Sequence, residues 1–265
     1  MLNRLVYITL FSLFPILLFS QIVSGPMLGQ VELRDAKVWM EVAPSVKNIQ
    51  LTYHKKGGAA KKTINYTGAS GKIFNTVQFA IGGLEPNTTY QYQILIDGKA
   101  VKGTHQFTTK DLWQWRKPAP DFSFITGSCA YFNEPVYDRP GKPYGGDSSI
   151  FETMAKENAA FMLWLGDNWY TREVDYYSEW GLWYRAHHDR KSPALQNLLK
   201  AMPHYATWDD HDYGPNNIGS NYILKKESRE VFKNYWANPS YGQEEEGIYT
   251  IVSYGDADIF LCDDR

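Results

Sequence analysis

Side chains that can bind metal ions follow three apolar runs of the sequence. Residues 159–165 precede Asp167, residues 122–126 precede Cys129, and residues 204–208 precede a cluster of acidic and polar side chains. The members of this cluster are Asp209, Asp210, His211, Asp212, Asn216 and Asn217. Because ligands of open α/β sheets bind at the carboxyl ends of the strands, the three runs predict a metal site at one edge of a sheet.

The acidic cluster after residue 208 favours a bound cation. Its three carboxylates surround one histidine, and like charges repel one another unless water or a cation compensates them. A solvated loop is the alternative interpretation. The apolar strand before the cluster favours the metal site, because two strands and the helix between them would bring the cluster and Asp167 to corresponding strand ends.

Cys129 and Tyr170 add two further donors near this edge. Cys129 ends its run in a Gly-Ser-Cys turn, and Tyr170 lies three residues beyond Asp167. Thiolate and phenolate ligands favour a ferric or similarly acidic ion, whereas an oxygen-only set suits calcium or magnesium. A disulfide between Cys129 and Cys262 is the alternative in an exported protein. Against it, Cys262 lies in an apolar run and is expected to be a buried thiol.

The elements around these residues alternate between strands and helices. A capping box formed by Ser149 and Glu152 predicts the start of a helix that reaches residue 158. Further helices are expected at residues 176–188, 193–202 and 225–236, and a final pair of strands at residues 248–254 and 258–264. This alternation predicts an α/β domain over residues 121–265.

Residues 21–110 are predicted to form an all-β domain. Short alternating runs separated by glycine-rich turns predict strands at residues 37–42, 49–53, 77–81, 90–96 and 104–108. The segment at residues 84–90 (LEPNTTY) resembles the tyrosine corner of fibronectin type III domains. Tyr90 would be the corner tyrosine and Trp39 the buried core tryptophan, so a β-sandwich is expected.

Residues 1–20 are typical of a secretory signal, because Arg4 precedes an apolar stretch. A single membrane anchor is the alternative, but the stretch is short for a span of about 20 residues. We therefore expect an exported, periplasmic or extracellular protein without a stable membrane span after cleavage. Residues 111–120 contain two prolines and predict a linker, in which Trp113 and Trp115 would pin the two domains together.

The composition is that of a globular protein without a nucleic-acid partner. The net charge is −2, and 43% of the 265 residues are hydrophobic. Nothing is basic enough to form a nucleic-acid-binding patch. The length leaves room for about two domains at roughly 100–200 residues each.

Three motifs in this order resemble the PhoD-type alkaline phosphatases, a branch of the calcineurin-like metallophosphoesterases. They are residues 127–129 (GSC), residues 165–170 (LGDNWY) and residues 208–212 (WDDHD), the last followed by two asparagines. The resemblance covers most of residues 25–265. It implies an exported hydrolase with an N-terminal β-sandwich and a four-layer αββα catalytic domain.

The resemblance also implies a dinuclear metal site. The implied ligands are Cys129, Asp167, Tyr170, Asp210 and Asn216 or Asn217, with Asp209 and Asp212 as additional candidates. The first three would hold iron (Fe³⁺), and Asp167 would bridge to calcium (Ca²⁺). His211 would hydrogen-bond the leaving group or a phosphate oxygen. The implied substrate is a small-molecule or cell-envelope phosphate ester that is hydrolysed by metal-activated water.

The family's later motifs, which supply further ligands, have no counterpart before Arg265. We therefore expect a chain that is truncated at its C-terminus and has little activity by itself. The alternative function is that of a non-enzymatic cell-surface β-domain protein that binds glycan or cell wall. Its binding residues would be Trp113, Trp115, Trp180 and Trp183.

Overall fold

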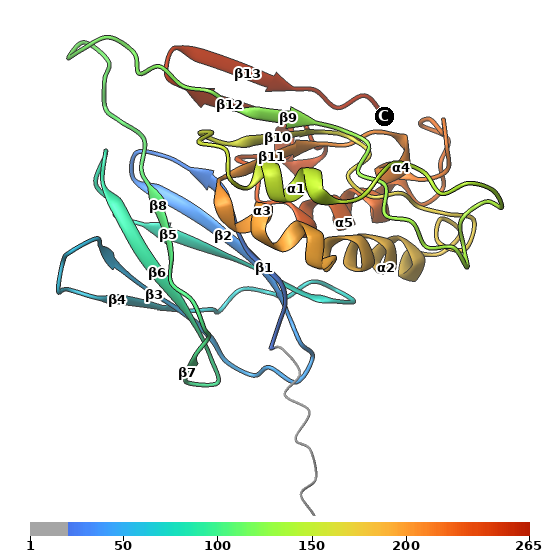
Figure 1. The fold of residues 1–265 in the computed structure, drawn as a ribbon, viewed down its shortest axis with the longest axis horizontal. Helices are drawn as coiled ribbons and strands as arrows, with labels where there is room; N and C mark the ends of the chain where they lie inside the picture. Colours follow the sequence, from blue (N-terminus) through green and yellow to red (C-terminus); the bar gives the residue numbers. More distant parts are fainter. Residues whose placement is uncertain (1–20) are drawn as a thin grey trace, which may run out of the picture.

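The computed structural model describes residues 21–265 (Figure 1). The predicted signal peptide at residues 1–20 lies outside the described residues. Among the described helices, none is long and apolar enough to cross a membrane. Antiparallel sheets occupy residues 22–108, and strands alternate with helices from Ile125 onward.

The N-terminal half consists of two packed antiparallel sheets. One sheet has the order β1-β2-β5, and the other has the order β4-β3-β6-β7 with β8 paired to β6. The strands are β1 (Ile22–Val31), β2 (Asp35–Val42), β3 (Ile49–Lys55), β4 (Lys62–Asn65), β5 (Asn75–Gly82), β6 (Thr89–Ile96), β7 (Lys99–Ala100) and β8 (His105–Thr108). The expected strands of this half are present, and the two sheets enclose an apolar core that includes Leu51, Phe79 and Ile94.

The predicted tyrosine corner is confirmed, because the Glu85 backbone N–H donates to the Tyr90 hydroxyl at 2.9 Å. Strands β1, β4 and β7 were not predicted. The sequence of β1 contains Gly25, Pro26 and Gly29, which are typical of turns. Gly29 is needed for packing, since a Cβ atom there would lie 2.3 Å from the Cβ of Ala237 in the other half.

The tyrosine-corner resemblance predicts that Trp39 packs inside the sandwich, and this prediction is wrong. Successive strand residues point to opposite faces, so Val38 and Met40 enter the sandwich core while Trp39 faces the second half. Its indole N–H donates to the Asn234 carbonyl at 2.7 Å. The prediction that the linker tryptophans hold the two domains together is also wrong for Trp115, because this side chain is fully exposed.

The second half is built on a parallel sheet with the order β11-β10-β9. Its strands are β9 (Ile125–Gly127), β10 (Met162–Leu165) and β11 (His204–Thr207). The central strand β10 was predicted to be buried on both faces. Met162 and Trp164 pack into the helical cluster, whereas Leu163 packs against the hairpin of β12 (Thr250–Tyr254) and β13 (Ala257–Leu261). Helices and hairpin thus cover opposite faces of the sheet (Figure 1).

Helices are present at all four predicted positions, although several of their ends differ, and α4 was not predicted. They are α1 (Ser149–Met154), α2 (Glu179–Arg190), α3 (Gln196–Ala201), α4 (Asp210–Tyr213) and α5 (Lys225–Tyr235), with short 3₁₀ turns η1 (Pro193–Leu195) and η2 (Gln243–Glu245). The predicted capping box at Ser149 is wrong. Ser149 is inside the helix, and its backbone N–H donates to the Asp147 carboxylate at 3.0 Å. The capping box occurs instead at α4, between Asp209 and Asp212.

Candidate metal centre

Asp167 leaves the sheet in a turn that brings it beside the start of α4. Gly166 has a φ of +94°, and Asp167 has a φ of +53° in the left-handed region, which aspartate tolerates better than most residues. A Cβ atom on Gly166 would lie 2.6 Å from the Cβ of Asp209. Glycine is therefore required at position 166, because the exits of β10 and β11 approach each other so closely.

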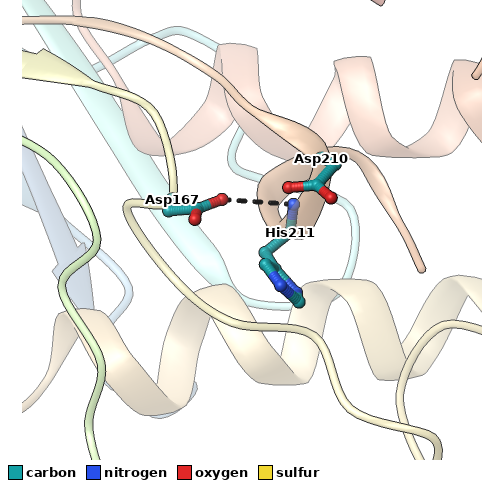
Figure 2. Close-up of side chains that lie close together, drawn as sticks. All are labelled: Asp167, Asp210 and His211. Atoms are coloured by element: carbon teal, nitrogen blue, oxygen red, sulfur yellow. Dashed lines mark hydrogen bonds between the residues drawn. The ribbon is translucent and has the colours of Figure 1, made fainter. Parts of the chain in front are cut away.

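Three ligand-type side chains meet where these exits converge. Single ligand atoms of Asp167, Asp210 and His211 all lie within 4.8 Å of one another. Figure 2 shows Asp167 facing the N-terminus of α4, which carries the other two residues. The His211 backbone N–H donates to Asp167 Oδ1 at 3.3 Å. The predicted convergence of the two acidic strand ends is therefore present in the fold.

Cys129 and Tyr170 approach the second oxygen of the same carboxylate. The Tyr170 hydroxyl donates to Asp167 Oδ2 at 2.8 Å, and the Cys129 sulfur lies 3.5 Å from that oxygen. The backbone places Cys129 there, since its N–H donates to the Gly166 carbonyl at 3.2 Å. Both cysteines are free, so they do not form a disulfide. Cys262 is exposed just beyond β13, which corrects the expectation of a buried thiol.

Asp212 has a different position from Asp210. It is buried, and its Oδ1 accepts hydrogen bonds from the backbone of Asn168 at 2.8 Å and of Trp169 at 3.3 Å. Its Oδ2 accepts from the Asp209 backbone at 2.9 Å. Both oxygens thus hold the backbone of the site. Burial, followed by the charge of Asp167, raises the pKa of Asp212 well above its usual value.

The remaining predicted residues lie around this cluster. The Asp209 side chain caps α4 and forms an ion pair with Arg265. The Asn217 backbone N–H, rather than its side chain, donates to Asp210 Oδ2. Asn216 is exposed and lines a neighbouring cavity. The structure therefore brings Cys129, Asp167, Tyr170, Asp210 and His211 together, with the two asparagines at the periphery.

The electrostatics of the cluster suit a cation. Burial, and then hydrogen bonds to Cys129 and Asp167, raise the pKa of the Tyr170 hydroxyl well above its usual value. A bound metal ion reverses this preference, because its charge stabilises a phenolate and a thiolate. His211 Nδ1 is buried and has no hydrogen-bond partner among the described residues. The His211 and Tyr170 rings lie 4.3 Å apart, so the imidazole is held over the phenol.

A cavity of about 690 Å³ opens beside the cluster, within the range of small-molecule sites. Cys129, Tyr170 and His211 form one end of its lining. Two lining arginines, Arg139 and Arg172, were not predicted from the sequence. Arg172 lies in the loop after β10, and Arg139 lies in the long loop after β9. Neither arginine belongs to a sequence motif that would indicate a role at the cavity.

Comparisons with known proteins support the fold of the chain. A family model described as a domain of unknown function (DUF7800) matches residues 19–111. No curated protein matches the sequence. A solved structure of PhoD is similar, with a TM-score of 0.63 and 16% identity over 86% of this chain and 49% of that chain. The chain therefore has a PhoD-like fold and spans about half the length of that structure.

A second solved structure resembles part of the chain more weakly. It is the sensor domain of the anti-sigma factor RsgI4 in Pseudobacteroides cellulosolvens, with a TM-score of 0.28 and 20% identity. The match covers 35% of this chain and 76% of that chain.

Proposed function

We propose that the chain belongs to a metal-dependent phosphatase or phosphodiesterase, which hydrolyses phosphate esters with metal-activated water. The observation that carries the proposal is the meeting of Asp167, Asp210 and His211 within 4.8 Å. The PhoD-like fold supports the same reaction class. The four-layer αββα arrangement, the domain boundaries at residues 110 and 120, and export after removal of residues 1–20 are parts of this proposal.

The donor atoms fit two metal ions of different character. Cys129 and Tyr170 both approach Asp167 Oδ2, and this thiol, phenol and carboxylate set favours iron. Asp210 adds a carboxylate close to Asp167, and an oxygen set of this kind favours calcium. We assign Asn216 or Asn217 to the calcium side. Asp209 and Asp212 are assigned to support of the backbone, because their oxygens are engaged there.

The residues of the chain have separate tasks in the reaction. When bound, the metal ions would lower the pKa of water and neutralise charge on the phosphate. Asp212 holds the amides of Asn168 and Trp169, and this keeps the turn that aims Asp167 in place. The His211 side chain lines the cavity, so its ring can donate a proton to the departing oxygen of the ester.

Metal binding by the Asp167→Asn variant tests the proposal. The chain, loaded with iron and calcium, should hold both metals and show a visible absorption band from Tyr170 bound to ferric iron. Loss of a direct ligand should weaken metal affinity by more than the roughly 10–100-fold seen for outer residues. Asp35→Asn, at an exposed position of the sandwich, is the matched control. Equal metal content in both variants would overturn the assignment.

Metal removal tests the reaction itself. The turnover of an aryl phosphate and of an aryl phosphodiester, however low in this chain, should be lost after chelation and return when iron and calcium are restored. Turnover that survives chelation would exclude metal-activated water.

The glycan-binding alternative would depend on the accessible tryptophans. Trp183 is fully buried, whereas Trp180 is 57% exposed and stacks on Tyr184. Trp113 is only partly exposed. These side chains do not gather in the cavity beside the cluster. A chain that binds soluble glycan and no metal would favour that alternative over the phosphoesterase.

A further inference from the structure

The outer wall of the cavity is aromatic and comes from the long loop between β9 and α1. Tyr131 and Tyr144 of this loop line the cavity together with Arg139. Tyr144 is 50% exposed, so its ring is accessible to a ligand. A site for phosphate alone would not need such a wall, because inorganic phosphate has no apolar surface to cover.

The aromatic wall begins at the metal centre and continues outward without a break. The ring of Tyr170, which lies over His211, is 4.7 Å from the ring of Tyr131. The ring of Tyr131 is in turn 4.9 Å from the ring of Tyr144. A ligand whose phosphate sits at His211 therefore has its alcohol part alongside Tyr131 and Tyr144.

The side chains of the loop hold both tyrosines in place. The Asn133 amide donates to the Tyr144 carbonyl at 2.8 Å, and the Tyr144 N–H donates to Asn133 Oδ1 at 2.9 Å. The Tyr131 hydroxyl donates to the Asp138 carboxylate at 2.7 Å. The Tyr131 ring is thus held through its hydroxyl and the Tyr144 backbone through Asn133, which lowers the entropy cost of binding.

Two buried arginines fasten this loop to the rest of the second half. Arg172 donates to Asp138 at 2.9 Å and to the Phe132 carbonyl at 2.6 Å, and its guanidinium lies 4.8 Å from the ring of Tyr131. Arg185, which is fully buried, lies 2.9 Å from the Glu134 carboxylate. The loop is therefore part of the packed structure, and the aromatic wall is built before any ligand arrives.

We propose that Tyr131 and Tyr144 form a subsite for the alcohol part of the substrate, and that this part carries a planar aromatic ring such as a nucleobase. The proposal rests on the phosphoesterase function given above. Stacking of a base on an aromatic side chain is strong enough for the loss of one ring to reduce kcat/KM by about tenfold. Arg139 lies at the same wall, where it forms an exposed ion pair with Glu173 at 3.6 Å.

A pair of substrates with the same leaving group tests the subsite. Adenosine 5′-phosphate and ribose 5-phosphate release the same kind of primary alkoxide, but only the first carries a base. The metal-loaded protein should hydrolyse the adenosine ester with the higher kcat/KM. Tyr144→Ala should lower this value about tenfold for adenosine 5′-phosphate and leave ribose 5-phosphate unchanged, whereas Tyr144→Phe should retain the preference.

Tyr137→Ala is the matched control, since Tyr137 lies exposed on the same loop and does not line the cavity. It should behave as the wild type with both esters. Equal kcat/KM for the two esters in the wild-type protein, or an equal loss for both in Tyr144→Ala, would overturn the subsite.

Binding of adenosine without phosphate separates the subsite from the proposed function. Calorimetry with the metal-free protein should detect adenosine, and Tyr144→Ala should abolish the signal while Tyr137→Ala retains it. If neither phosphate ester is hydrolysed but adenosine binds in this pattern, the phosphoesterase function fails and the subsite stands. If the esters are hydrolysed but adenosine does not bind, the subsite fails and the phosphoesterase function stands.

Discussion

The two halves of the molecule bury different kinds of side chain. The space between the two sheets of the N-terminal half is filled by apolar and aromatic residues such as Val38, Phe79 and Tyr92. The second half buries many ionisable groups in addition to its apolar cluster. These are Asp167, Arg172, Asp175, Arg185, Asp189, Arg190, His204, Asp210 and Asp212.

The exception in the first half lies on the boundary. Glu41 is buried on β2, and its partners belong to the second half: His187 Nδ1 lies 2.6 Å from its Oε1, and the Tyr235 hydroxyl donates to its Oε2 at 3.2 Å. Buried charges destabilise a fold unless they are paired. In this molecule Asp167, Asp210 and Asp212 lie at the candidate metal centre. Arg172 and Arg185 hold the loop beside it.

The largest effect is expected for Arg185→Met. Arg185 is fully buried among Asp175, Asp189 and Glu134, at 2.8, 3.2 and 2.9 Å. Removing the cation leaves buried carboxylates without a partner, which costs about 3–5 kcal/mol in unfolding free energy. Urea unfolding measures this loss. Arg34→Met, at an exposed position of the sandwich, should unfold like the wild type, and equal stability of both variants would contradict the comparison.

A pH-dependent loss of stability is expected from His204. Burial lowers the pKa of His204 to about 3, and the neutral ring accepts from the Trp164 indole at 3.0 Å. In the unfolded chain this pKa is about 6.5, so below that pH only the unfolded state gains a proton. Stability should therefore be complete above pH 6.5 and should fall by about 1.4 kcal/mol per pH unit towards pH 3, or about 2 kcal/mol at pH 5.

The variant His204→Gln should remove this slope between pH 6.5 and 5 in urea titrations. His105→Gln in the sandwich is the control. Burial lowers the pKa of His105 as well, but this side chain is only partly buried, so its variant should change the slope less. A steeper change for His105→Gln would reverse the comparison between the halves.

A smaller effect is expected at the boundary between the halves. Trp39→Phe removes the indole donor of the Asn234 carbonyl and leaves that partly buried acceptor without this partner. The unfolding free energy should fall by about 1.5 kcal/mol. Met40→Leu replaces the neighbouring residue, which faces the sandwich core, at nearly constant volume. A larger loss of unfolding free energy for Met40→Leu than for Trp39→Phe would mean that the sandwich core contributes more to stability than the boundary does.

The smallest effect is expected for Tyr90→Phe. The change removes the hydroxyl that accepts from the Glu85 N–H at 2.9 Å and keeps the ring in the apolar core. A loss of about 1 kcal/mol is expected from one partly buried hydrogen bond. Iron content and the visible absorption band should remain as in the wild type. A loss of metal in this variant would mean that the corner positions the metal centre as well as the sandwich.

Local patterns were sufficient for much of the fold. The apolar run of β10, the glycine-rich turns of the first half and the tyrosine corner appear where the sequence predicts them, because each depends on neighbouring residues. The patterns failed where distant segments meet. Strand β1 was not predicted, because glycine is typical of turns. In the structure Gly29 lies within the strand and leaves room for the close approach of Ala237. Trp39 was assigned to the wrong core, because strand alternation does not say which face meets a second domain.

The sequence by itself determined the chemical types at the candidate site and the strand ends that carry them. Cys129, Asp167 and Asp210 each follow an apolar run, and the run fixes the point at which the side chain leaves the sheet. Only the tertiary structure decided that Asp210 joins the ligand cluster while Asp212 turns inward to hold three backbone N–H groups. Two aspartates of one helix turn are alike in sequence, and what they do depends on which neighbouring strand end their oxygens face.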